Sequence, residues 1–315
     1  MTGLLTPTTY SVDPWDPGYG VARGDELDGR ESSARLDLDV ELPASSWRPL
    51  TPADGALPGS VLFLDGVRRI DARVWVHGEG PEPLPGVIAS LAAGLVRCDG
   101  AAQIVDVQVD RGLYAATGGD IETRHARYRF HHTPGGLDQL TLGVQRRLSE
   151  LEVELANAWR KNSNVEDDLL VVDGPLRGRT HLARTVGYVK THQKSYLQAS
   201  QAEVVASLGP GQRSPVFKMG TSWERLSWYL RLPGASRAPW SAIVRLECSA
   251  DLSAQDAIAL ADVTGQVLPQ LASTPHKDPR APQNLVPIGG LERQLRHRLG
   301  DAALLYRALR GALSA

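Results

Sequence analysis

Two apolar runs that each end in Asp-Gly dominate the pattern of hydrophobic and polar positions along the chain. The first is Val-Leu-Phe-Leu-Asp-Gly at 61–66, and the second is Leu-Leu-Val-Val-Asp-Gly at 169–174. Four consecutive apolar residues of this kind predict a strand that is buried on both faces. Each strand then places a carboxylate, Asp65 or Asp173, at its C-terminal end, where an α/β sheet opens to solvent and ligand. The glycine that follows allows a sharp turn and the close approach of a neighbouring segment.

Further strands and one long helix are predicted between these two runs. Residues 70–76 alternate and predict a strand paired antiparallel to the first one, and 87–96 and 104–109 predict two more. A helix follows, because apolar residues recur there at intervals of three and four and form one stripe. The residues of this stripe are Leu140, Val144, Leu148, Leu151, Leu155 and Trp159. The order strand, strand, strand, helix, strand is that of the ribonuclease-H-like fold, so we expect an α/β protein with a mixed sheet flanked by helices.

The remainder of the chain predicts additional β-rich and C-terminal helical elements. Strand-like segments lie at 185–188, 203–208, 228–232 and 241–248, and a helix at 253–271, a Pro-rich loop at 274–287 and a helical segment at 288–314 follow them. Residues 1–59 are rich in Pro, Gly, Asp and Ser, with one short alternation at 36–42. We therefore expect an N-terminal arm or wrapping segment over 1–59 and one large domain over 60–315.

Composition narrows the functional class. The 315 residues carry a formal net charge of −2, so any nucleic acid must be held by a local basic strip. The two cysteines, Cys98 and Cys248, show no zinc-ligand spacing and are expected to be reduced thiols. No signal peptide and no apolar run of membrane-spanning length is apparent, so a cytoplasmic protein without a membrane partner is expected.

Asp65 and Asp173 are the first candidates for chemistry. Asp-Gly is also a common turn dipeptide, and that reading accounts for either site taken alone. As a pair they repel each other unless a cation lies between them, which predicts Mg²⁺ or Mn²⁺ and metal-dependent phosphodiester chemistry. Glu150, Glu152 and Glu154 lie off the apolar stripe of the helix, where a solvated face explains most of them. Of the helix acids, Glu154 is modestly favoured over Glu150 as a third ligand.

A basic and aromatic segment follows the second Asp-Gly strand. Lys190 and Lys194 are one helical turn apart and lie near Tyr188, while Arg177 and Arg179 precede them. Cations beside aromatic rings suit phosphate contact and base stacking, although an exposed mixed-charge segment has the same spacing. The adjacent residues His131 and His132 point to opposite faces of a strand and are not expected to share an ion.

The sequence resembles the NurA nuclease family. The resemblance rests on Leu-Asp-Gly-Val-Arg-Arg around Asp65, Val-Val-Asp-Gly-Pro-Leu around Asp173 and Gly-Tyr-Val-Lys-Thr-His around Lys190, and Val-Arg-Leu-Glu at 244–247 also looks like the family's late strand. It covers roughly 60–295. It implies a ribonuclease-H-like metal-dependent deoxyribonuclease that binds Mn²⁺ and processes DNA ends, working as a toroidal homodimer beside a hexameric HerA-type ATPase.

The same resemblance implies roles for individual residues. Asp65 and Asp173 match the metal-binding aspartates, and the family's helix acid falls on Glu150 or Glu154. The family ordinarily has a catalytic histidine near the C-terminus, but the comparable stretch at 282–291 contains none. His276, a few residues upstream, is the candidate substitute.

Two other functions fit parts of the pattern. The first is a non-catalytic adaptor with the same fold and a degraded metal site, which the absent histidine favours. The second is a phosphotransferase of the actin and sugar-kinase superfamily, which also uses Asp-Gly elements at strand ends. The chain has no Gly-rich phosphate loop of that pattern, which counts against the phosphotransferase.

Overall fold

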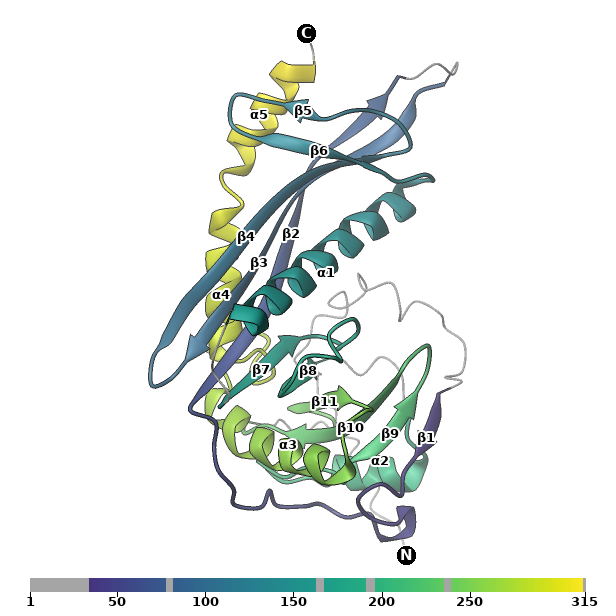
Figure 1. Cartoon of the computed structure of the whole chain (residues 1–315), viewed down its shortest axis with the longest axis vertical. Coiled ribbons are helices and arrows are strands. Elements are labelled where there is room, and N and C mark those ends of the chain that lie inside the picture. Colours follow the sequence, from purple (N-terminus) through teal and green to yellow (C-terminus); the bar gives the residue numbers. More distant parts are fainter. Residues whose placement is uncertain (1–33, 78–81, 163–166, 191–195, 235–238, 314–315) are drawn as a thin grey trace, which may run out of the picture. The chain divides into compact units, whose positions relative to one another are not determined.

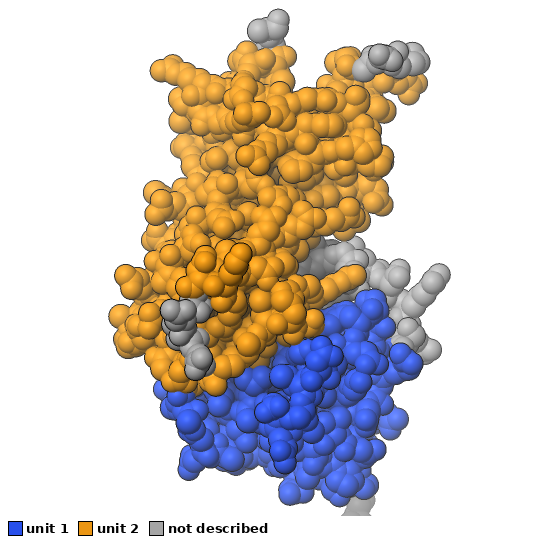
Figure 2. Space-filling model, viewed as in Figure 1, with its two compact units in different colours: residues 1–22, 28–57, 188–286 blue, residues 23–27, 58–187, 287–315 orange. Residues whose placement is uncertain are grey.

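The computed structural model describes residues 34–77, 82–162, 167–190, 196–234 and 239–313. The chain divides into two compact units, which Figure 2 colours blue and orange. The described part of unit 1 lies within 34–57 and 188–286, and that of unit 2 within 58–187 and 287–313. Within the described residues, no helix is both long enough and apolar enough to cross a membrane.

Unit 2 contains a mixed sheet flanked by helices (Figure 1). Its strands are β2 (Ser60–Val76), β3 (Leu84–Cys98), β4 (Ala102–Ala115), β5 (Ile121–Glu122), β6 (Arg127–His132) and β7 (Asp168–Asp173), and β8 (Thr185–Val189) begins in this unit. Its helices are α1 (Leu137–Asn162), α4 (Val286–Arg298) and α5 (Ala302–Leu313). The strands lie in the order β7-β2-β3-β4-β6-β5. β3 is antiparallel to β2 and β4, whereas β7 is parallel to β2. The α/β class predicted from the sequence is confirmed.

Helices cover both faces of this sheet in the region where β2 pairs with β3. Gly66 on β2 faces α1, because a Cβ added there would overlap Leu148 and Glu152. Gly94 on β3 pairs with Asp65 and faces α4, since a Cβ there would meet Leu291 and Leu295. Side chains alternate between faces along a strand, so α1 and α4 pack on opposite sides of the sheet (Figure 1). The stripe predicted for α1 is confirmed from Leu140 to Leu155, all five of whose apolar residues are buried.

β2 is one long strand rather than two. We expected strands at 61–66 and 70–76 paired with each other, but the chain continues through Gly66 and pairs with β3 along its whole length, with an irregularity between Ile70 and Ala72. The two arginines after Gly66 do not form a turn. Arg69 instead binds Asp71, at 2.7 Å, and the carbonyl oxygen of Gly300, also at 2.7 Å. The expected turn after Asp65 was therefore wrong.

The C-terminal helical segment is divided in two. Residues 288–314 were expected to be helical, and the structure has α4 and α5 separated at Gly300, whose φ is +80°. Asp301 then begins α5, because its carboxylate accepts a hydrogen bond of 2.7 Å from the backbone N–H of Leu304. Glycine in the left-handed region followed by an aspartate cap is an ordinary way to end one helix and start the next.

Unit 1 contains an antiparallel sheet in the order β1-β9-β10-β11. Its elements are β1 (Arg35–Asp37), the 3-10 helix η1 (Ala44–Ser46), α2 (Ala199–Ala206), β9 (Phe217–Gly220), β10 (Glu224–Arg231), β11 (Ile243–Ser249), α3 (Ala254–Val267) and the 3-10 helix η2 (Leu268–Leu271). The strand expected at 203–208 is wrong, since this segment belongs mostly to α2. The buried side chains in 201–208 are Gln201, Val205 and Leu208, and their spacing is helical. Cys98 in unit 2 and Cys248 in unit 1 are both free thiols.

The described part of the N-terminal segment is built into unit 1. β1 pairs with β9, and Trp47 is buried against Phe217 in the core of the unit. The guanidinium of Arg213 binds Glu41 at 2.8 Å and Asp262 at 2.7 Å. Residues 34–57 are therefore an integral part of the fold, while 1–33 lie outside the described residues. A single domain over 60–315 stays a prediction.

We expect Arg213→Met to lower the free energy of unfolding by about 3–5 kcal/mol, because the change leaves two carboxylates without their buried partner. Urea denaturation of the full chain measures this effect. Lys218→Gln removes an exposed ion pair with Glu224 and is the matched control, for which no measurable change is expected. Equal unfolding midpoints for the two variants would contradict the stabilising role of the ion pairs of Arg213.

Candidate metal centre

The structure brings Asp65 and Asp173 together. β2 and β7 are parallel and in register from Ser60 and Asp168 to Leu64 and Val172, so the two aspartates that follow lie side by side. Asp65 is 3% exposed and Asp173 is 8% exposed. The chain turns directly after Asp173 at Gly174, whose φ is +109°. Two neighbouring parallel strands therefore present two buried carboxylates at one place, as the sequence predicted.

Glu292 on α4 supplies a third carboxylate. One oxygen from each of Asp65, Asp173 and Glu292 lies within 4.8 Å of the others, and we call these three residues the carboxylate cluster. Glu292 reaches the aspartates because α4 lies close to the sheet. Gly94, the β3 partner of Asp65, leaves room for this, since a Cβ at that position would be only 2.9 Å from Leu295 and 3.0 Å from Leu291.

The C-terminal end of α4 is held by two arginines from the sheet. Arg69 donates to the carbonyl oxygens of Gly300 at 2.7 Å and Leu299 at 3.3 Å. Arg111 on β4 donates to the carbonyl oxygen of Leu299 at 3.2 Å. Cations at the C-terminus of a helix offset its partial negative charge and satisfy its last carbonyl groups. These contacts fix α4 along the sheet and so fix where Glu292 lies.

The donor set of the carboxylate cluster suits a hard divalent cation. Three carboxylates this close repel one another strongly when ionised, and a cation between them removes the repulsion. Mg²⁺ and Mn²⁺ prefer oxygen ligands, and all the cluster's donors are carboxylate oxygens. The backbone N–H of Gly66 donates to one oxygen of Asp65 at 2.7 Å, which fixes the orientation of that carboxylate. The cluster can therefore bind a divalent metal.

Comparison with protein families gives a match that covers most of the chain. The model of the NurA domain matches residues 20–288. The chain belongs to the NurA family. Membership in the NurA family indicates a nuclease-associated function and hydrolase chemistry, in agreement with the resemblance noted in the sequence. No curated protein was found that matches the chain.

The acids predicted as helix ligands lie elsewhere. Arg147 binds Glu154 at 2.7 Å and Glu150 at 3.5 Å, and both glutamates are about half exposed. The inward-facing acid of α1 is Glu152, which is 8% exposed, lies against Gly66 and is paired with Arg179. Residues two positions apart differ by about 200° around a helix, so Glu150 and Glu154 point away when Glu152 points inward. The structure therefore does not place either predicted glutamate in the carboxylate cluster.

The histidine candidate does not join the cluster either. His276 is exposed in a turn, and the cluster found among the described residues consists of three carboxylates. Sequence reasoning missed Glu292, although one signal was available. Glu292 adjoins an apolar stripe formed by Ile288, Leu291 and Leu295, and an acid at the edge of such a stripe is half turned toward the core.

The basic residues predicted to contact nucleic acid are mostly engaged inside the protein. Lys190 is 7% exposed and donates to Asn284 at 2.8 Å, and Tyr188 is fully buried with its hydroxyl donating to the carbonyl oxygen of Gln283 at 2.7 Å. The stacking role predicted for Tyr188 is therefore contradicted by its burial. Arg179 is buried in its pair with Glu152, whereas Arg177 is exposed. Lys194 lies outside the described residues.

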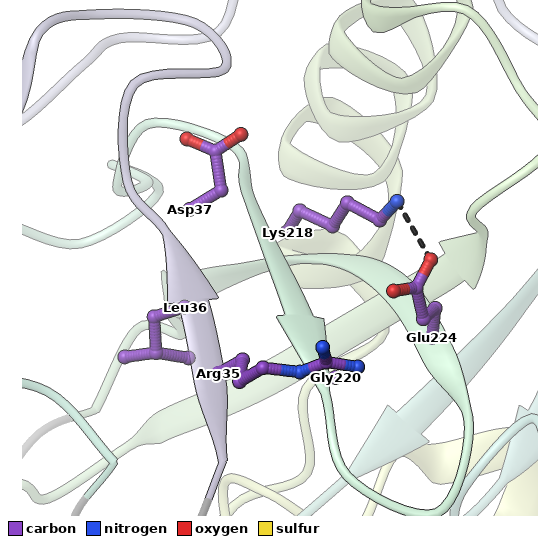
Figure 3. A pocket seen from close by; sticks show the side chains of 6 residues that line it. All are labelled: Arg35, Leu36, Asp37, Lys218, Gly220 and Glu224. Atoms are coloured by element: carbon purple, nitrogen blue, oxygen red, sulfur yellow. Dashed lines mark ion pairs between the residues drawn. The ribbon is translucent and has the colours of Figure 1, made fainter.

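Two other features are separate from the cluster. His131 stacks on Tyr114 with ring centroids 4.8 Å apart, and burial lowers the pKa of this histidine, whereas His132 is exposed. Figure 3 shows a shallow pocket of unit 1 that contains no member of the carboxylate cluster. It is lined by Arg35, Leu36, Asp37, Lys218, Gly220 and Glu224, and its lysine is paired with Glu224.

We expect Gly94→Ala to weaken both folding and metal binding, because the added methyl group pushes against Leu291 and Leu295 and displaces α4. Overpacking of this kind costs about 1–3 kcal/mol in the free energy of unfolding. Calorimetric titration with Mn²⁺ should also show a weaker affinity. Gly290→Ala is the control on the same helix, since a Cβ there meets nothing within 4 Å, and it should leave Mn²⁺ affinity unchanged. Equal Mn²⁺ affinity in the two variants would refute the positioning role of Gly94.

Proposed function

We propose that this NurA-family chain is a metal-dependent deoxyribonuclease that hydrolyses phosphodiester bonds at DNA ends. The observation that carries the proposal is the convergence of Asp65, Asp173 and Glu292 in a chain of this family. Neither part is sufficient alone. Acidic groups are common on proteins without a metal, and family membership does not say whether a particular copy keeps its site.

The strand arrangement supports a ribonuclease-H-like core. β2, β3 and β4 form an antiparallel meander, α1 follows them, and β7 returns to pair parallel with β2 on its other side. This arrangement puts Asp65 on the first long strand next to Asp173 on the strand after the helix. The adjacency of the two aspartates supports the proposal that they are metal ligands.

In the proposed reaction, Asp65, Asp173 and Glu292 would hold Mn²⁺ or Mg²⁺. When bound, such a cation supplies a Lewis acid that activates water and offsets charge on the phosphate. Asp65 and Asp173 are the ligands held by the sheet, and Glu292 is the ligand held by α4. Glu152 lies against Gly66 on the other face of the sheet, where its pair with Arg179 neutralises its charge.

Partners belong to the same proposal. We infer that the chain acts on DNA beside a HerA-type hexameric ATPase and as a homodimer, on the basis of the family alone. The alternative is a non-catalytic adaptor that docks on the ATPase, and one observation favours it: the stretch at 282–291 has no histidine. Glu292 follows that stretch directly and provides a charged oxygen ligand instead, which favours the nuclease. An adaptor would bind the ATPase and release no nucleotides in Mn²⁺.

We expect Asp65→Asn to abolish Mn²⁺-dependent degradation of linear DNA while the folded state persists. The change removes the charge of one ligand but keeps its shape. Release of acid-soluble nucleotides measures the activity, and circular dichroism checks folding. Glu150→Gln is the control, since Glu150 is bound to Arg147 outside the cluster, and it should retain activity. Unchanged cleavage by Asp65→Asn would sink the proposal.

Glu292 gives a separate test of the third ligand. We expect Glu292→Gln to lower the rate of cleavage by at least about tenfold, since removal of one charged ligand weakens metal binding by an order of magnitude or more. Glu292→His should recover part of the activity, because imidazole is also a ligand for Mn²⁺ and the family ordinarily uses histidine late in the chain. Nuclease assays over a range of Mn²⁺ concentrations compare the three proteins. If Glu292→Gln matches the parent at limiting Mn²⁺, Glu292 is not a ligand.

A further inference from the structure

The C-terminal helices carry a cluster of positive charge. None of its arginines is among the residues predicted from the sequence to bind nucleic acid. Residues 286–313 contain five arginines and two acids, a formal charge of +3 in a chain of net charge −2. The two acids are both engaged, Glu292 in the carboxylate cluster and Asp301 at the start of α5. Five arginines are exposed, and among the described residues none of their side chains forms a hydrogen bond or ion pair; they are Arg293, Arg296, Arg298, Arg307 and Arg310.

Two of these arginines adjoin the metal ligand on the same helix. With about 100° between successive residues, Arg296 lies about 40° around α4 from Glu292 and Arg293 about 100° from it in the same direction. Leu291 and Leu295 lie on the other side of Glu292, where they pack against Gly94. Glu292 is therefore at the border between the buried face and the solvent, and Arg293 and Arg296 are the first exposed side chains beyond it. We call these two residues the arginine pair.

We propose that the arginine pair binds backbone phosphates of the DNA strand that enters the carboxylate cluster. This inference rests on the proposed nuclease function, and it names residues for the substrate. A strand at the cluster brings several phosphates, of which a bound cation can neutralise only the nearest. Arg293 and Arg296 lie about 4.5 Å apart along the helix axis, and exposed guanidinium groups are well suited to phosphate oxygens.

The rigidity of α4 favours this role. Arg69 and Arg111 hold its C-terminal end, and its apolar face is packed closely on β3. Because one helix carries both Glu292 and the arginine pair, the distance between the metal ligand and the phosphate contacts is set by helix geometry. Two of the basic residues predicted from the sequence are engaged inside the protein, since Lys190 and Arg179 are buried in contacts with Asn284 and Glu152.

Binding of a fluorescent single-stranded oligonucleotide, followed by anisotropy in Ca²⁺ over a range of salt concentrations, tests the proposal. Loss of two phosphate contacts in the Arg293→Gln/Arg296→Gln variant should weaken DNA binding about 20-fold at 0.1 M salt. The slope of the logarithm of the binding constant against the logarithm of the salt concentration should become shallower by about 1.4. The Arg293→Lys/Arg296→Lys variant keeps both charges and should retain most of the salt dependence. Mn²⁺ affinity, measured by calorimetry, should be the same in all these proteins.

The Arg307→Gln/Arg310→Gln variant is the matched control. It removes the same charge from two exposed arginines with the same spacing on α5. α5 packs near Ile88, which is about 20 Å along β3 from Gly94, so little loss of DNA binding is expected. Equal losses in the two glutamine variants would show a diffuse charge effect and overturn the proposal.

The remaining outcomes separate this inference from the nuclease itself. If the wild-type chain binds DNA through the arginine pair and cleaves nothing in Mn²⁺, the proposed function fails and this inference stands. If the Arg293→Gln/Arg296→Gln variant binds DNA as tightly as the wild type, the inference fails. Intact cleavage of DNA by the wild type in that case leaves the nuclease proposal in place.

Discussion

The close packing of α4 against β3 is the constraint on which the candidate metal centre depends. The absence of a side chain at Gly94 lets Leu291 and Leu295 approach the strand directly opposite Asp65. Only at that separation can Glu292 reach the two aspartates. On the other face, the absence of a side chain at Gly66 lets Leu148 and Glu152 of α1 pack closely on the strand. A Cβ at either glycine would overlap side chains of a helix that carries an acid, so both helices pack closely on the sheet beside Asp65.

Charge is handled differently on the two faces of the sheet. On the α1 face, Glu152 is buried with Arg179, so its charge is cancelled locally. On the α4 face, Asp65, Asp173 and Glu292 are brought together with carboxylate oxygens facing one another. A divalent cation bound by these three carboxylates would reduce their mutual repulsion, and its binding free energy would add to the stability of the folded state. Such a cation would also link α4 to the two aspartate-bearing strands.

Sequence patterns predicted those parts that depend on local periodicity. The stripe of α1 follows from the three- and four-residue spacing of its apolar residues, and the strand that ends at Asp173 follows from a single apolar run. The continuation of β2 through Gly66 did not follow, because the arginines after it find partners only in the α4–α5 connection, far along the chain. Glu292 was missed for the same reason. Its proximity to Asp65 arises from a helix docked on a glycine of another strand, and no short window of sequence records that contact.

The position of Glu292 also bears on what the missing histidine means. A degraded centre would be expected to leave the place of the lost ligand open or apolar, whereas here a carboxylate lies within 4.8 Å of both aspartates. A carboxylate at this place keeps an oxygen donor beside the two aspartates, which is what a centre that binds a divalent cation requires. A carboxylate in the role that a histidine has in the family would add negative charge close to an anionic substrate. The arginines that follow on α4 would supply the compensating positive charge, and a helix that carries both is consistent with a changed ligand set rather than a lost one.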